Sequence, residues 1–191
     1  LSTKWSLESF EEIYGRLNNS LDYTILESQT ADTGLVESEK ALSKNLLQKS
    51  DEAIVYLPSK NEKLIPVVFV NSSGFPLYAA KDLGLIQMKQ DLWPDMTKTL
   101  VFTANEQTAS FKVVTKVIQD LYPELGSDFL THIGHGYLSL TTGKMSSRSG
   151  EVLPANQALN TIKQAVLVKM KDREIIDLQK EEIAEKIAQA A

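Results

Sequence analysis

Residues 143–150, GKMSSRSG, carry the side chains of this sequence that are best suited to binding a polyphosphate. Lys144 and Arg148 supply positive charge, and Ser146 and Ser147 add hydroxyl donors. The flanking glycines favour a mobile loop, which could close over a triphosphate while Lys144 neutralises the charge that develops during transfer. Taken alone, the same stretch could be a solvated basic turn, so neighbouring motifs must decide between the two interpretations.

The composition excludes several kinds of catalytic site. The chain has no cysteine and only two histidines, which excludes disulfides, cysteine-rich zinc sites and a Cys–His nucleophilic pair. The formal net charge of −5 gives no chain-wide basic field that would attract nucleic acid. Any contact with nucleic acid must therefore be local or lie outside this chain.

The length and hydropathy are those of a globular protein. The 191 residues fit one domain of moderate size, with 42% hydrophobic and 24% charged residues. The longest apolar run, residues 65–70, is far too short to span a membrane, and the first ten residues have no secretion signal. We therefore expect a cytoplasmic protein without a membrane segment, and the missing initiator methionine suggests an excised piece.

Two periodicities predict the elements that must position the chemical groups. Helical spacing of apolar residues predicts helices over 7–17, 34–48, 79–89, 106–121, 156–170 and 174–191. Short apolar runs predict strands over 22–26, 52–58, 64–70 and 98–104, and one or two more within 128–141. The strands over 52–58 and 64–70 should form a hairpin, whereas the later alternation of helix and strand predicts a parallel sheet flanked by helices.

Four ordered motifs resemble one known family. They are LDYTILESQ at 21–29, GFPLYAAKDLG at 74–84, VFTANEQTASF at 101–111 and HIGHGYLSLTTGKMSSRSG at 132–150. Their order and distances resemble the second half of the catalytic domain of arginyl-tRNA synthetases, which belong to class I. In that family a Leu-Tyr-x-x-x-Asp segment starts a helix, a Gln follows a strand, and a Lys-Met-Ser-Thr-Arg loop comes last.

The resemblance extends over about residues 10–165 and implies an α/β fold. This fold would be the second half of a Rossmann-like class I synthetase catalytic domain, with a parallel sheet flanked by helices, a small β-hairpin insertion and C-terminal helices. Residues 1–165 would form this partial catalytic domain. Residues 166–191 would form a helical segment that leads toward an anticodon-binding domain.

The sequence His-Ile-Gly-His at 132–135 also matches a class I signature, but its position is wrong. The functional signature of these enzymes follows the first strand of the nucleotide-binding fold, where a helix amino terminus faces the phosphates. Residues 132–135 follow a late strand instead, directly before the Lys-Met-Ser loop. We interpret this match as accidental, and the functional signature would then precede Leu1, as expected for a fragment.

Tyr78 and Asp82 are spaced for one face of a helix. A carboxylate accepts a guanidinium through two parallel hydrogen bonds, and an aromatic ring can flank the guanidinium plane. The resemblance implies that Asp82 is the carboxylate that selects arginine and that Tyr78 is its neighbour. The alternatives are a surface carboxylate at Asp82 paired with Lys81 or another base, and a core aromatic at Tyr78.

Glu27 and Gln107 are two further candidates for binding the amino acid. We expect each to follow a strand at the sheet edge where ligands collect. The resemblance implies that Glu27 is a second guanidinium partner or a support for the pocket, and that Gln107 binds the polar end of the amino acid. The alternatives are a solvated turn residue at Glu27 and helix capping by Asn105, Glu106 or Gln107.

The resemblance also implies an ATP site. His132 and Gly136 would border the adenine, although His132 could instead be a satisfied core histidine. Lys144 and Arg148 would act on the phosphates as the catalytic groups. The loop residues that would bind ATP are Lys144, Met145, Ser146 and Ser147. Mg²⁺ would accompany ATP, but no acid cluster in the sequence marks a metal site built by the protein.

The implied activity is that of an arginine–tRNA ligase, which forms arginyl-adenylate from arginine and ATP and then transfers arginine to tRNA(Arg). We expect the tRNA to bind through the full-length protein and the 191 residues alone to be inactive. One alternative is a synthetase-derived, non-catalytic binding or regulatory module. Another is a synthetase for a different amino acid, which Tyr78 and Asp82 beside Glu27 disfavour.

Overall fold

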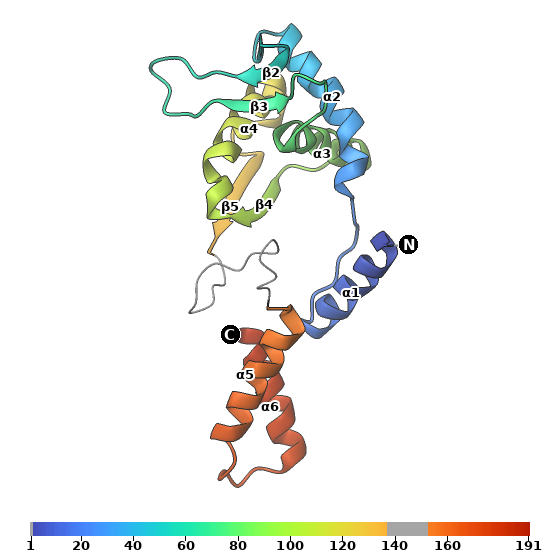
Figure 1. Ribbon diagram of the computed structural model, residues 1–191, viewed down its shortest axis with the longest axis vertical. Helices are drawn as coiled ribbons and strands as arrows, with labels where there is room; N and C mark the ends of the chain where they lie inside the picture. The colour runs from blue at the N-terminus through green and yellow to red at the C-terminus, as the bar shows by residue number, and fades with distance from the viewer. Residues whose placement is uncertain (1, 137–152) are drawn as a thin grey trace. The chain divides into compact units, whose positions relative to one another are not determined.

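The computed structural model describes residues 2–136 and 153–191, which belong to two compact units. One unit spans residues 24–138, and the other combines residues 1–23 with residues 139–191 (Figure 1). Each unit has its own helices, and the described strands all lie in the unit over residues 24–138. No helix in the described ranges is both long enough and apolar enough to cross a membrane.

The described part of the second unit is helical. It contains α1 (Ser2–Arg16), α5 (Ala155–Lys169) and α6 (Asp177–Ala190). All three helices were predicted, although α1 begins before the predicted residue 7. The helices α5 and α6 form a hairpin in which small side chains of α6, Ala184 and Ala188, are buried.

Arg16, the last residue of α1, connects the three helices of this unit. Its Nε donates to Glu185 Oε1 of α6 at 2.8 Å, and its terminal nitrogens donate to Asn156 Oδ1 at 3.0 Å and Asn160 Oδ1 at 2.8 Å of α5. A hydrogen bond between charged groups is stronger than one between neutral groups. The planar guanidinium therefore holds α1 against the hairpin through several bonds at once.

The unit over residues 24–138 begins with a helix and a small antiparallel sheet. The helix is α2 (Glu27–Ser43), and the strands β1 (Gln48–Ser50), β2 (Ala53–Tyr56) and β3 (Val67–Val70) lie in the order β1-β2-β3. The predicted hairpin is confirmed by the antiparallel pairing of β2 with β3. The strand β1 was missed, because residue 48 was assigned to the preceding helix.

The second half of this unit alternates helix and strand as predicted. Its elements in chain order are α3 (Tyr78–Leu92), β4 (Thr99–Ala104), the 3₁₀ turn η1 (Asn105–Gln107), α4 (Thr108–Leu121), the 3₁₀ turn η2 (Pro123–Leu125) and β5 (Leu130–His135). The strands β4 and β5 are parallel, with Thr99 opposite Leu130. The helix α4 joins them and packs against β5, so the prediction of an α/β fold with a parallel sheet is confirmed.

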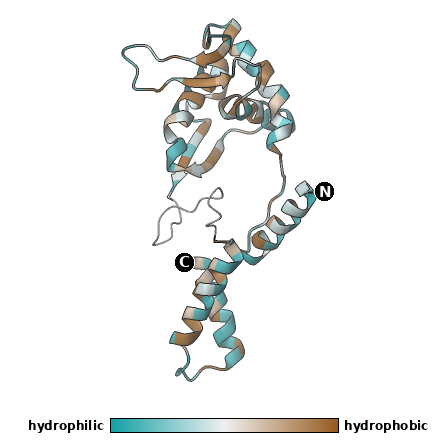
Figure 2. Cartoon of the chain, viewed as in Figure 1, coloured by the Kyte–Doolittle hydropathy of each residue, from teal (hydrophilic) through white to brown (hydrophobic). Residues whose placement is uncertain are grey.

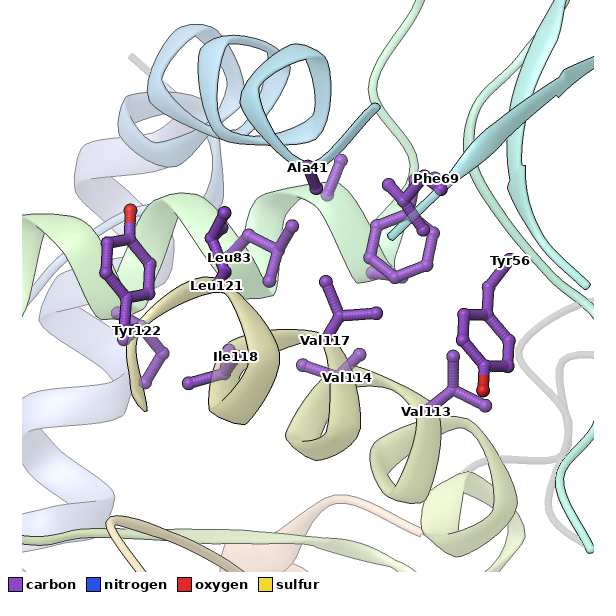
Figure 3. Close-up of a cluster of buried hydrophobic side chains, with 14 of the residues drawn as sticks. Ala41, Tyr56, Phe69, Leu83, Val113, Val114, Val117, Ile118, Leu121 and Tyr122 are labelled. Atoms are coloured by element: carbon purple, nitrogen blue, oxygen red, sulfur yellow. The ribbon is translucent and has the colours of Figure 1, made fainter. Parts of the chain in front are cut away.

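The core of this unit forms around α4. The predicted apolar face of the helix is buried throughout, and its residues are Phe111, Val114, Val117, Ile118 and Leu121. Figure 3 shows the α4 side chains directed toward Leu83 of α3 and Phe69 of β3. Colouring by hydropathy shows the same concentration of apolar residues on β2, β3 and α4 (Figure 2). Burying each such side chain contributes roughly 1.5–3 kcal/mol.

A buried polar cluster ties the end of α4 to α2. The hydroxyl of Tyr122 donates to the carboxylate of Glu37, which is only 5% exposed, and accepts a hydrogen bond from Lys40 Nζ at 2.9 Å. Burial, and then the hydrogen bond to Glu37, raise the pKa of Tyr122. The hydroxyl therefore stays protonated and remains a donor to Glu37.

Two predictions about the start of α2 are wrong. Residues 22–26 form no strand, and they pair with no strand within the described residues. Glu27 therefore begins a helix rather than following a strand, and that helix starts well before the predicted residue 34. Leu26 is extended, with φ −81° and ψ 145°, and its N–H donates to Gln29 Oε1 at 2.6 Å, which satisfies a donor at the helix start.

Candidate functional site

The candidate site is positioned by the close crossing of α2 and α3 at two glycines. A Cβ built on Gly84 would lie 2.3 Å from Thr30 O and 2.5 Å from Gly34 N, and one built on Gly34 would lie 2.3 Å from Ala80 O. No side chain larger than hydrogen fits at either position unless the helices separate. The glycines thus allow backbone contact, which places the first turns of the two helices beside each other.

A cavity of about 260 Å³ lies between these first turns. Its lining residues are Ile25, Glu27, Thr30, Tyr78, Lys81, Asp82 and Leu85. The structure therefore brings together Glu27, Tyr78 and Asp82, the three residues that the sequence suggested for a guanidinium. Larger hollows exist elsewhere, but this cavity is the one in which the predicted carboxylates converge.

Asp82 is the most unusual ionisable group of the cavity. Burial, and secondarily the negative charge of Glu27, raise its pKa to about 7. No residue in the described ranges makes a hydrogen bond or ion pair with its carboxylate, and Lys81 pairs elsewhere. The alternative of a surface carboxylate paired with Lys81 is therefore contradicted. A carboxylate in this setting gains strongly from a cationic ligand that restores its charged form.

Glu27 and Tyr78 form the more open side of the cavity. Glu27 Oε1 accepts from Lys81 Nζ at 2.6 Å, and the same ammonium lies 5.7 Å from the ring centroid of Tyr78. Tyr78 is 76% exposed, so the alternative of a core aromatic is wrong. Most of its ring is therefore accessible to a planar cation that enters from solvent.

Gln107 lies at the carboxyl end of β4, as predicted, but it does not line this cavity. It is the last residue of η1 and occupies the N-cap of α4 without a capping hydrogen bond from its side chain. The side chain is exposed and is not used in capping α4. The close approach of η1 to β5 depends on Gly134, because a Cβ there would lie 2.3 Å from Asn105 Oδ1.

His132 projects from β5 and is engaged with its neighbours. Its Nε2 is hydrogen-bonded to Thr103 Oγ1 at 2.8 Å, and its ring stacks on Phe111 with centroids 4.6 Å apart and planes 5° from parallel. The ring also lines a hollow of about 540 Å³. Gly136 is exposed, with open space around the position of a Cβ. His132 is therefore a half-buried histidine whose Nε2 has a hydrogen-bond partner. The space beside Gly136, directly after β5, is open.

The predicted phosphate-binding residues Lys144, Met145, Ser146, Ser147 and Arg148 lie outside the described residues. Within residues 2–136 and 153–191, no group of three histidine, aspartate or glutamate side chains is arranged to hold a metal ion. The sequence did not suggest that Thr30 lines the cavity, and it suggested Lys81 only as a possible partner of Asp82. Thr30 follows Glu27 by one helical turn, which could have placed it on the same face, whereas the partner of Lys81 had no sequence signal.

Comparisons with known proteins identify the family of the chain. Residues 4–191 match the family model described as tRNA synthetases class I (R), catalytic domain. The arginine–tRNA ligase of Treponema denticola is 30% identical over 168 residues, which are 88% of this chain and 28% of that protein. The arginine–tRNA ligase of Treponema pallidum is 28% identical over 191 residues, which are 98% of this chain and 32% of that protein.

Two solved structures share the fold. The arginyl-tRNA synthetase of Thermus thermophilus has a TM-score of 0.63 at 17% identity and covers 92% of this chain with 35% of its own. The arginyl-tRNA synthetase of Plasmodium falciparum has a TM-score of 0.61 at 19% identity and covers 98% of this chain with 31% of its own. The chain thus spans about a third of the length of these relatives. Because the family model extends over nearly the whole sequence, the chain belongs to the class I tRNA synthetase (R) catalytic-domain family.

Proposed function

We propose that this chain is part of an arginine–tRNA ligase, which activates arginine with ATP and transfers it to tRNA(Arg). The observation that carries the proposal is the cavity between α2 and α3, in which Asp82 has no cationic partner within the described residues and lies with Glu27 and Tyr78. Family membership supports the same conclusion. The two arguments support each other, because the residues that the family resemblance assigns to arginine line one cavity.

The cavity suits a guanidinium for electrostatic and geometric reasons. Arginine stays protonated under all ordinary conditions and presents its donors in a planar fork. Asp82 would accept two parallel hydrogen bonds from this fork, and Tyr78 would flank its plane. The carboxylate of Glu27 adds negative charge beside Asp82. A neutral side chain would gain neither the ion pair with the carboxylates nor the cation–π attraction to Tyr78.

The reaction would proceed without a covalent enzyme intermediate. The carboxylate of arginine attacks the α-phosphate of ATP and releases pyrophosphate, and a terminal ribose hydroxyl of tRNA then takes the arginyl group. Catalysis would rest on positioning and charge stabilisation. Gln107 would hold the polar end of arginine, and His132 and Gly136 would border the adenine.

The loop over residues 143–150 would complete the ATP site. Lys144 and Arg148 would stabilise the charge that develops on the phosphates, and the polar side chains between them would bind the nucleotide. Those further ATP-binding residues are Met145, Ser146 and Ser147. Mg²⁺ would arrive with ATP and offset part of the phosphate charge.

We further propose that residues 1–165 form part of the catalytic domain and that residues 166–191 lead toward an anticodon-binding domain. The protein would work in the cytoplasm, where its tRNA is found. Because the chain spans about a third of the length of its relatives, we expect the 191 residues alone to show no arginine-dependent pyrophosphate exchange. A synthetase-derived, non-catalytic binding or regulatory module is the second candidate.

The test uses the longest natural form of the protein. We expect Asp82→Ala to raise the KM for arginine in pyrophosphate exchange by a factor on the order of 30 to 1,000, which corresponds to the loss of one partner of a buried charged pair. Lys60→Ala, at an exposed loop position of the same unit, serves as the control. An Asp82→Ala enzyme that kept its KM and selectivity for arginine would show that Asp82 is not the carboxylate that selects the substrate. Arginine binding without any exchange would favour the non-catalytic module.

A further inference from the structure

Among the residues that the structure describes, Lys81 is the one cation that lines the cavity between α2 and α3. It precedes Asp82 on α3, yet its side chain reaches across to α2 and pairs with Glu27 at 2.6 Å. Its side chain is 26% exposed, whereas that of Glu27 is 57% exposed. The ammonium therefore lies within the wall of the cavity, with a path to solvent.

The ammonium of Lys81 already lies beside two of the groups that are proposed to bind a guanidinium. It contacts the carboxylate of Glu27 and lies 5.7 Å from the ring centroid of Tyr78. A guanidinium that paired with Asp82 and approached Glu27 and Tyr78 would compete with the ammonium for these two groups. Two cations in contact repel each other strongly in a partly desolvated site, so both cannot stay on Glu27.

The charges of the empty cavity support this conclusion. Glu27 and Asp82 are its acids, Lys81 is its base, and Tyr78 is its remaining ionisable group. Lys81 compensates Glu27, which leaves Asp82 without a partner in the described residues. Without Lys81, two uncompensated carboxylates would lie in one small cavity.

We propose that Lys81 is a resident counter-ion, which occupies Glu27 while the cavity is empty and is displaced from it by the guanidinium of the ligand. The proposal rests on the proposed function, since it assumes that the ligand is arginine. Lys81 is a positioning residue, because it keeps Glu27 oriented and its charge compensated until the ligand arrives.

The exchange favours the ligand for a chemical reason. A guanidinium forms a planar pair of hydrogen bonds with a carboxylate and is more weakly hydrated than an ammonium. The lysine ammonium makes a single contact with Glu27 and regains its hydration when its flexible side chain moves out. A ligand with an ammonium group would replace the Lys81 ammonium by an equivalent group, so its binding would be less favourable than that of a guanidinium.

The experiment measures binding of arginine to the longest natural form of the protein at pH 8, by isothermal titration calorimetry. We expect Lys81→Met to bind arginine about two- to fivefold more tightly than the unaltered chain, because no resident cation must leave. Lys81→Arg should bind it about two- to fivefold more weakly, because a resident guanidinium is harder to displace. Lys60→Met, which removes a charge elsewhere in the unit, should leave the affinity unchanged.

The outcomes separate this proposal from the proposed function. Equal or weaker binding by Lys81→Met, in a protein whose circular dichroism spectrum shows it folded, would mean that Lys81 supports the ligand site and is not displaced. Lys81→Gln provides the same test with a polar side chain if the methionine variant fails to fold. If the unaltered chain and every variant fail to bind arginine, the guanidinium site is wrong and this proposal fails with it. If the unaltered chain binds but the order of affinities differs, only the displacement is wrong.

Discussion

Gly84 of α3 lies against Gly34 of α2 so closely that a Cβ on Gly84 would be 2.5 Å from Gly34 N and 2.9 Å from its Cα. The contact is between backbones, which cannot move aside as a flexible side chain can. The two helices contribute every residue of the cavity wall except Ile25. The geometry of the candidate site therefore depends on Gly34 and Gly84, which have no side chain that could contact a ligand.

Gly84→Ala should lower the free energy of unfolding of the unit over residues 24–138 by about 1–3 kcal/mol or more, because the helices must separate. In an open helix the same change would stabilise by roughly 1 kcal/mol. Urea unfolding followed by the fluorescence of Trp93, in a Trp5→Phe background, measures this unit because the chain has only two tryptophans.

Gly15→Ala is the matched control for Gly84→Ala. Gly15 lies within the helix α1, and nothing lies within 4 Å of a Cβ placed there. Circular dichroism should show unchanged or slightly higher stability for this variant. Equal stabilisation by both substitutions would show that the close crossing is absent in solution.

Asp82 should make stability depend on pH in a predictable direction. Its pKa is raised from 3.8 to about 7 in the folded protein, so between these values the folded state holds a proton that the unfolded state has released. Stability therefore falls as the pH rises through this window. Asp82→Asn removes the effect, and its stability relative to the unaltered chain should rise by about 1–3 kcal/mol between pH 4 and pH 8.

Urea unfolding at both pH values tests this prediction. Asp95→Asn, at an exposed carboxylate of the same unit, should stay within roughly 0.5 kcal/mol of the unaltered chain throughout. If Asp82→Asn instead lost stability relative to the unaltered chain between pH 4 and pH 8, the carboxylate would have a stabilising partner in the folded state. The lower unfolding free energy above pH 7 is the expected cost of a buried carboxylate that has no cationic partner until a ligand binds.

Tyr122→Phe should destabilise the same unit through Glu37. The substitution removes the hydroxyl that donates to this buried carboxylate and leaves only Lys40 Nζ at 3.5 Å. An unsatisfied buried acceptor costs about 1–3 kcal/mol. Tyr78→Phe, at a tyrosine that is 76% exposed, should change the unfolding free energy by less than roughly 0.5 kcal/mol. Similar values for both variants would mean that Glu37 finds another partner or water.

The sequence predicted the elements whose apolar spacing is strong. The face of α4 that contains Val114 and Val117 is buried as its period requires, and Tyr78 and Asp82 line one cavity because they share a face of α3. Predictions failed where local pattern and tertiary structure differ. Residues 22–26 have the composition of a strand, but a strand needs a partner, which no single segment can reveal.

Two features of the site had no local signal. The pairing of Lys81 with Glu27 joins residues that are 54 positions apart, and the nearest acid in sequence, Asp82, is not the partner. Asp32 and Thr33 have residue types that are common at a helix start, which is why α2 was predicted to start only at Gly34. The structure places Gly34 inside the helix, where another backbone approaches it.

His132 and His135 differ sharply in what they contact, although both belong to the His-Ile-Gly-His stretch. His132 stacks on Phe111 and bonds to Thr103, whereas His135 is exposed and its only described polar contact is with the carbonyl of Gly136, the next residue. We expect His132→Ala to lower the unfolding free energy by about 1–3 kcal/mol, through the lost stack and hydrogen bond.

His135→Ala is the matched control and should change the unfolding free energy by less than roughly 0.5 kcal/mol. His132→Phe should recover most of the loss, because it restores a ring against Phe111 without the bond to Thr103. A functional signature of paired histidines would require both rings to face one ligand. A larger loss of stability in His132→Ala than in His135→Ala, with recovery in His132→Phe, would instead show that His132 supports β5 by packing. This is the role that its stack on Phe111 indicates.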